Sequence, residues 1–162
     1  MKYTLPLICF VFVSMLAIAQ KQKTNPNKTA VIQSVDKHQE ELIDLSDKLW
    51  SYAETALKEY KSAKVLADYA EAQGFVVKRG VAGMPTAFTA EFGAGKPVIG
   101  IMGEYDALPG ISQKAQPTKE AYETGAAGHG CGHNLFGAGS LGAAVAVKPR
   151  IKEHGSSQTR AP

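Results

Sequence analysis

The densest group of chemically reactive side chains lies in one glycine-rich stretch, residues 128–134 (GHGCGHN). His129, Cys131 and His133 alternate with glycines, and glycine removes side-chain bulk and lets the backbone bend around an ion. A thiolate and an imidazole together suit a borderline-soft ion such as zinc. A lone cysteine is more often a small buried apolar residue, but the three residues on one turn favour a metal site. Any further ligands must come from elsewhere in the fold.

A second stretch, residues 103–110 (GEYDALPG), places two carboxylates directly after an apolar run. Glu104 and Asp106 are two positions apart, so they lie on the same side of an extended chain. Open α/β sheets bind ligands at the carboxyl ends of their strands. The competing interpretation is a strand that runs into a Pro-Gly turn with two solvated acids, and this stretch alone favours it.

Three helices are expected around these stretches. Apolar residues recur at helical spacing over residues 31–56 and again over residues 62–73, where Gly74 is expected to end the helix. A small-residue helix is predicted over residues 135–147, and Pro149 is expected to end it. It contains GAGSLG, which matches the dinucleotide pattern G-x-G-x-x-G, but no strand precedes it directly and no acid follows about 20 residues on. Close packing of the helix against a sheet is the simpler use of these glycines.

Three strands are expected between the helices. Residues 75–77 begin one and residues 86–92 form another, with a turn at residues 80–85. Residues 98–103 (VIGIMG) form a continuous apolar run, which is typical of a strand buried on both faces. Residues 111–128 are predicted as a long polar loop. Alternating helices and strands indicate an α/β layer structure.

The first residues have the pattern of a secretory signal peptide. Lys2 supplies the positive charge, residues 5–19 are almost unbroken in their apolar character, and the sequence Ala-Ile-Ala at 17–19 suits cleavage. The segment is short for a membrane anchor, which needs about 20 residues. We therefore expect an exported protein, periplasmic or extracellular, with a flexible leader at 20–30. Cleavage would leave Cys131 without a disulfide partner.

Composition excludes several other classes. A charged fraction of 20% is near the globular average of about 25%, so wholesale disorder is excluded. The net charge of +3 is small, and no basic stripe carries interleaved aromatic residues, so nucleic acid is a poor candidate for a partner. Beyond the leader no apolar run is long enough for a membrane span, so no membrane contact is expected after cleavage.

Three separated motifs resemble one family in the family's own order. These are residues 58–93, residues 97–113 (PVIGIMGEYDALPGISQ) and residues 128–148 (GHGCGHNLFGAGSLGAAVAVK). They are similar to the amidohydrolase branch of the metal-dependent aminoacylase/carboxypeptidase superfamily, and within it to the p-aminobenzoyl-glutamate hydrolase group. The resemblance implies an α/β, three-layer, zinc-peptidase-like catalytic domain with a mixed sheet. It also implies two divalent metal ions, Zn or Mn, and homodimers in complete members, which hydrolyse N-acyl amino acids, p-aminobenzoyl-glutamate-like conjugates or dipeptides.

The resemblance assigns roles to individual residues. It implies that Cys131 and His133 are metal ligands and that Asp106, the catalytic candidate, orients a metal-binding imidazole. Glu104 falls where peptidase relatives have a histidine ligand, so the resemblance does not support a metal role for it. Asn134 stands where relatives often have Asp. The resemblance says nothing of His129.

The same resemblance implies that part of the site is missing. Family members continue with a strand and an adjacent glutamate pair, one of which is the general base, whereas residues 149–162 read as a polar tail without such a pair. Residues 31–148 are therefore expected to be the N-terminal part of a truncated catalytic domain. The predicted function is a metal-dependent amidohydrolase fragment that is inactive alone; the alternative is a non-catalytic metal-binding remnant.

Overall fold

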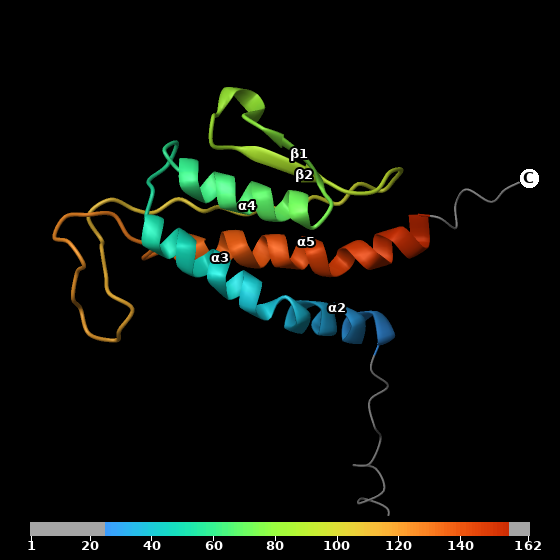
Figure 1. Cartoon of the computed structure of the whole chain (residues 1–162), viewed down its shortest axis with the longest axis horizontal. Coiled ribbons are helices and arrows are strands. Elements are labelled where there is room, and N and C mark those ends of the chain that lie inside the picture. Colours follow the sequence, from blue (N-terminus) through green and yellow to red (C-terminus); the bar gives the residue numbers. More distant parts are fainter. Residues whose placement is uncertain (1–24, 156–162) are drawn as a thin grey trace, which may run out of the picture.

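The computed structural model describes residues 25–155, so the predicted signal peptide and the end of the predicted tail lie outside it. The described chain combines helices with a small antiparallel sheet, which confirms the α/β class. Figure 1 shows α5 running along the molecule, with α2 and α3 on one side and α4 and the two strands on the other. No helix among the described residues has the length and apolar character to cross a membrane. In chain order the elements are α2 (Pro26–Lys37), α3 (Gln39–Tyr52), α4 (Tyr60–Ala72), β1 (Val76–Arg79), the 3₁₀ helix η1 (Val81–Gly83), β2 (Phe88–Glu91) and α5 (His133–Gly155).

The helix predicted over residues 31–56 is two helices that meet at His38. α2 begins inside the predicted leader, because the Asn25 side chain accepts a hydrogen bond from the Asn27 amide (2.9 Å) and Pro26 fits the first helical turn. At the junction the His38 imidazole bonds to the Ser34 carbonyl (2.7 Å), and the His38 backbone leaves helical geometry. α3 then ends at Tyr52, earlier than predicted.

The core is made by facing helices and contains mostly small and branched apolar residues. Leu49 of α3 and Leu66 of α4 are almost completely buried. On α5, glycines allow close approach: a Cβ on Gly142 would lie 2.7 Å from Leu42 Cδ1, and one on Gly137 would lie 2.9 Å from the Glu104 carbonyl oxygen. The GAGSLG glycines therefore serve packing, as predicted, but against α3 and the chain at residue 104 instead of a sheet.

The α4 helix and the hairpin after it form as predicted, with small shifts in their bounds. Gly74 has φ +82° and its amide donates to the Glu71 carbonyl (2.8 Å), while the Phe75 amide donates to the Ala70 carbonyl (3.0 Å). These two bonds are the Schellman arrangement, which satisfies the last carbonyls of a helix. β1 and β2 then pair antiparallel, with Val76 opposite Glu91 and Arg79 opposite Phe88.

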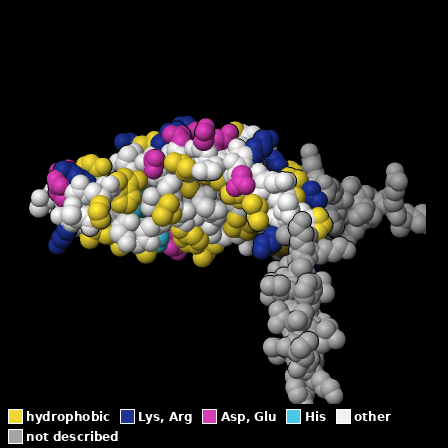
Figure 2. Space-filling model, turned by 90° about the horizontal axis from the view of Figure 1, so that it is seen from below, with side chains coloured by type: hydrophobic (Ala, Val, Ile, Leu, Met, Phe, Trp, Pro, Cys, Tyr) yellow, Lys and Arg dark blue, Asp and Glu magenta, His cyan; other side chains and the backbone are white. Residues whose placement is uncertain are grey.

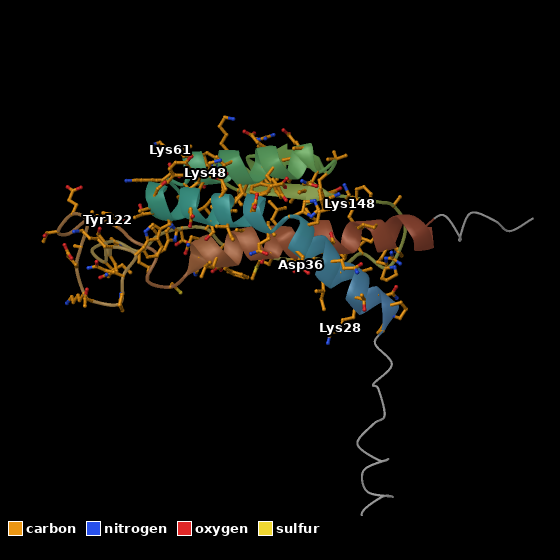
Figure 3. All side chains as sticks on the ribbon, turned by 60° about the horizontal axis from the view of Figure 1, so that its bottom comes forward. Lys28, Asp36, Lys48, Lys61, Tyr122 and Lys148 are labelled. Carbon is orange, nitrogen blue, oxygen red and sulfur yellow. The ribbon has the colours of Figure 1, made fainter. Side chains whose placement is uncertain are left out.

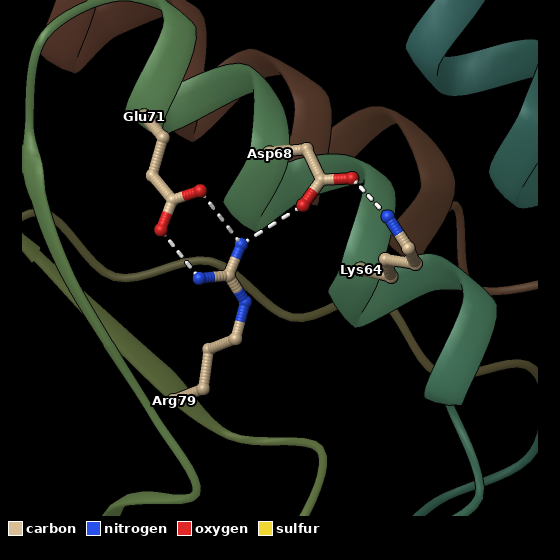
Figure 4. A network of polar contacts seen from close by, with 4 residues as sticks. All are labelled: Lys64, Asp68, Glu71 and Arg79. Carbon is tan, nitrogen blue, oxygen red and sulfur yellow. Dashed lines mark hydrogen bonds and ion pairs between the residues drawn. The ribbon is translucent and has the colours of Figure 1, made fainter.

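Charged side chains tie the hairpin to α4 (Figure 4). The Arg79 guanidinium binds Glu71 (2.5 Å) and Asp68 (2.9 Å), and Lys64 also binds Asp68 (2.5 Å). The Lys64 ammonium holds the pKa of Asp68 below its usual value, and Arg79 does the same for the pKa of Glu71. All four side chains are substantially exposed, so we expect a small contribution to stability.

The buried strand predicted at residues 98–103 does not form. The segment belongs to no strand, and Val98 and Ile99 are 85% and 81% exposed. The Ser140 hydroxyl, on α5, holds the segment by donating to the Met102 carbonyl (2.8 Å). The physical reason is the lack of a neighbour, because β1 and β2 pair with each other and no third strand is present among residues 25–155.

α5 continues further than predicted. It begins at His133 and runs to Gly155, so Pro149 lies inside the helix and the first residues of the predicted polar tail are helical. An interior proline removes one backbone donor and crowds the carbonyl four residues earlier, which costs about 3 kcal/mol that packing of the helix must offset. Val145 and Ala146, shortly before it, are buried. Hydrophobic side chains are spread along the face seen in Figure 2, between the charged groups.

Candidate metal centre

Two isolated β-bridges position the stretch at residues 103–110, and one of them joins it to the stretch at residues 128–134. The Ala107 amide donates to the Glu54 carbonyl (2.7 Å), directly after α3. Leu108 and Gly128 exchange two backbone hydrogen bonds of 3.0 Å each. The GEYDALPG stretch is therefore held between the end of α3 and the start of the Cys/His turn. The loop between residues 110 and 128, which carries Tyr122, extends beyond the helices (Figure 3).

His133 is the meeting point of the two stretches. Its Nδ1 lies 2.7 Å from Asp106 Oδ1, and its Nε2 lies 3.1 Å from Glu104 Oε2. The imidazole is 17% exposed, Asp106 24% and Glu104 50%. The two carboxylates do lie on the same side of an extended chain, as their spacing predicted, and both reach one ring. A carboxylate on Nδ1 fixes the tautomer that leaves Nε2 free for a metal ion.

Tyr105, between the two acids, points the other way. Its hydroxyl donates to the Thr86 carbonyl, and burial raises the pKa of Tyr105 to about 12. Thr86 in turn donates to the carboxylate of Glu59, which is buried at the start of α4 (2.7 Å). Alternation along the extended chain therefore anchors one side to the hairpin region and presents the other to His133.

His129 is an anchor in this structure. It is 5% exposed, its Nε2 lies 2.9 Å from the Leu49 carbonyl oxygen, and its ring stacks on Trp50. Burial lowers the pKa of His129, so the neutral ring donates from Nε2 to that carbonyl. Its buried Nδ1 has no hydrogen-bond partner among the described residues. The contact fixes the turn against the C-terminus of α3.

Cys131 is a free, exposed thiol on the same turn. Gly132 has φ +77°, which favours glycine, and its amide donates to the His129 carbonyl (3.0 Å). The side-chain amide of Asn134 donates to the Ser46 hydroxyl (3.0 Å), and both residues are buried. Asn134 therefore fastens the first turn of α5 to α3 and takes no part in the contacts around the His133 imidazole.

Glu54 is the positioning residue that sequence analysis missed. Its carboxylate accepts from the amides of Lys61 (3.0 Å) and Ser62 (2.8 Å), so it caps α4 from outside the helix. Its own carbonyl accepts from Ala107, next to Asp106. The signal in the sequence is an acidic residue seven and eight positions before the amides that begin α4, which have no partner within the helix. The geometry of the loop decides whether the carboxylate reaches them.

The donor set fits a metal ion in part. Asp106 directs His133 Nε2 outward, and the Cys131 thiol is accessible. Within residues 25–151, however, no group of three His, Cys, Asp or Glu side chains is arranged to hold an ion, and Asp106 and Glu104 contact different nitrogens of the His133 ring. A shallow hollow of about 300 Å³ lies between α4 and the hairpin, and another of about 420 Å³ lies between α3 and α4. Asp106, Cys131 and His133 line neither of them. The metal roles predicted for Cys131 and His133 thus stay predictions.

Comparison with known proteins identifies relatives that act on amide bonds. The chain is 44% identical over 129 residues to a p-aminobenzoyl-glutamate hydrolase subunit of Escherichia coli strain K12, covering 78% of this chain and 26% of that protein. It is 31% identical to the human Xaa-Arg dipeptidase and 28% identical to the mouse one, over 73% and 77% of this chain. The chain spans about a quarter of the length of these relatives. No family model matches it.

Proposed function

We propose that this chain forms part of a metal-dependent amidohydrolase site. The premise is that it belongs to the amidohydrolase and peptidase family that contains p-aminobenzoyl-glutamate hydrolase and the Xaa-Arg dipeptidases. The substrate would be a small N-acyl amino acid, a p-aminobenzoyl-glutamate-like conjugate or a dipeptide. The observation that carries the proposal is the 2.7 Å contact between Asp106 and His133 Nδ1. It orients the imidazole as in a carboxylate–histidine–metal triad.

Each residue has a distinct task in this proposal. His133 Nε2 and the Cys131 thiolate would hold a divalent ion, and Asp106 would keep His133 in the tautomer that can bind it. Cys131 lies just before α5, and a helix N-terminus stabilises a thiolate. When bound, the metal would activate a water molecule and polarise the amide carbonyl. His129 and Asn134 would keep the turn rigid against α3, so that the ligands keep their places.

Titration of the purified chain with zinc and with manganese tests the metal part. We expect weak binding that Cys131→Ser or His133→Ala reduces at least tenfold, because each change removes a direct ligand. Asp106→Asn should cost about 10–100-fold in affinity, the usual loss when such a supporting partner is changed. His38→Ala, which alters a histidine far from the site in sequence, is the control and should bind as the wild type. Equal affinity of all variants would refute the site.

A metal binder without turnover is the second candidate, because three ligands do not converge among the described residues. Hydrolysis assays with N-acyl amino acids and p-aminobenzoyl-glutamate separate the two. We expect little turnover, since no group of three side chains among the described residues is arranged to hold an ion and a loosely held metal activates water poorly. Turnover above a metal-free control, abolished by Cys131→Ser, would show that the chain assembles a complete site by itself.

Export is a further part of the proposal, supported by the charged, apolar and Ala-Ile-Ala order of residues 1–19. Mass spectrometry of the expressed protein should find a mature chain that begins at Gln20. A mature species that still begins at Met1 would contradict it.

A further inference from the structure

We propose that Glu104 is a ligand of the same metal ion as His133. The inference rests on the proposed metal function and adds a residue to which sequence analysis assigned no metal role. Glu104 Oε2 lies 3.1 Å from His133 Nε2, the nitrogen that Asp106 leaves available. The carboxylate therefore stands on the side of the ring where an ion would bind.

Electrostatics supports a cation between these two atoms. In the tautomer in which Nδ1 donates to Asp106, Nε2 carries the lone pair that an ion can bind. A lone pair and a carboxylate oxygen at 3.1 Å are two acceptors facing each other, which is unfavourable unless a positive group lies between them. Among the ion pairs of residues 25–151, Glu104 takes part only in the one with His133. Either a proton or a metal ion between His133 Nε2 and Glu104 Oε2 would remove this repulsion. Metal titration distinguishes the two cases.

The separation of the two donors also suits a metal ion. Zinc binds imidazole nitrogen and carboxylate oxygen at about 2.1 Å, and donors 3.1 Å apart then subtend about 95° at the ion. This angle lies between the octahedral value of about 90° and the tetrahedral value of about 109°. The side chain is half exposed, so an ion can approach without opening the fold. Cys131, exposed two residues before His133, is placed in sequence to supply a third donor.

The test compares Glu104→Gln with the wild-type chain by zinc calorimetry and by cobalt absorption spectroscopy. Glutamine keeps the size and a carbonyl acceptor but removes the charge, so a direct ligand should be weakened at least tenfold. The cobalt ligand-field spectrum should also change in shape. Glu123→Gln, a matched change in the long loop, is the control and should bind as the wild type. Circular dichroism confirms that each variant is folded.

Three results would overturn the inference. Wild-type affinity and an unchanged cobalt spectrum in Glu104→Gln, with binding lost in His133→Ala, would leave the metal site standing and show that Glu104 is not a ligand. Tighter zinc binding by Glu104→Gln would show that the carboxylate favours a proton on Nε2 and so keeps the ion away from that nitrogen. Failure of the wild-type chain to bind zinc or cobalt would refute this inference together with the proposed metal site.

Discussion

Two regions of the chain, residues 54–92 and residues 93–132, differ in how far their backbone hydrogen bonds and apolar side chains find partners within the same region. In the first, Glu54 caps α4, Gly74 closes its other end, and the two strands pair with each other. In the second, apolar side chains at residues 98–102 are exposed and the backbone is held at a few bridges. The candidate chemistry belongs to the second region. A site in this chain therefore depends on residues 93–132, the region that relies more on contacts with other segments.

Leu49→Ala should have the largest effect, because it truncates one of the largest fully buried side chains among the described residues. The side chain is 0% exposed, whereas the carbonyl that holds His129 belongs to the backbone and remains in the variant. Removing a buried leucine side chain costs about 2–5 kcal/mol. Urea unfolding followed by far-UV circular dichroism measures the change. Val98→Ala, on a residue 85% exposed, is the control, and an equal loss in both variants would show that residues 98–102 are packed in solution.

Glu54→Ala should have the next largest effect, since it removes the cap of α4 while leaving the backbone bond to Ala107. The carboxylate accepts from two helix-start amides and from the Ser62 hydroxyl (2.8 Å). Loss of a helix cap costs about 0.5–2 kcal/mol. The same urea experiment measures it, and Glu123→Ala in the loop should lose much less. If both variants unfold alike, the cap does not stabilise the fold.

Arg79→Met should change stability by less than about 1 kcal/mol, because its ion pairs are exposed. The pH dependence has a definite sign. Asp68 and Glu71 have lowered pKa values in the folded state, so their contribution is present above the unfolded values near 3.8 and 4.5 and is lost as the pH falls through the folded ones. The difference between wild type and Arg79→Met in urea midpoint should therefore shrink on acidification. A difference that stays constant with pH would mean that Arg79 acts through packing.

Val98→Thr with Ile99→Thr should have the smallest effect on stability and a visible one on solubility. Both residues are mostly exposed, so surface substitutions there should stay within about 0.5 kcal/mol. An unpaired apolar extended segment promotes association, which the polar pair should reduce. Light scattering of concentrated samples measures this, with Val76→Thr on the exposed hairpin as the control. Unchanged association would show that residues 98–102 are already covered.

What the sequence predicted well depends on near neighbours. The end of α4 at Gly74 and the hairpin follow from residues a few positions apart, and the turn glycines fix them locally. The spacing of Glu104 and Asp106 likewise predicted one shared face. The strand at 98–103 was wrong because a strand needs a partner that the pattern of one segment does not reveal. The Glu54 cap and the His129 anchor escaped prediction because each depends on how the chain folds back.

The bond between His129 and the Leu49 carbonyl joins positions 80 residues apart, and this separation sets the order of events during translation. Ribosomes add about 5–20 residues per second, so about 4–16 s pass between synthesis of Leu49 and synthesis of its imidazole partner. α5, which follows directly, supplies the buried Ala138 and Val145. Until α5 has been synthesised, the apolar face of α3 therefore stays partly exposed on the nascent chain. Chaperones can bind that face during this time.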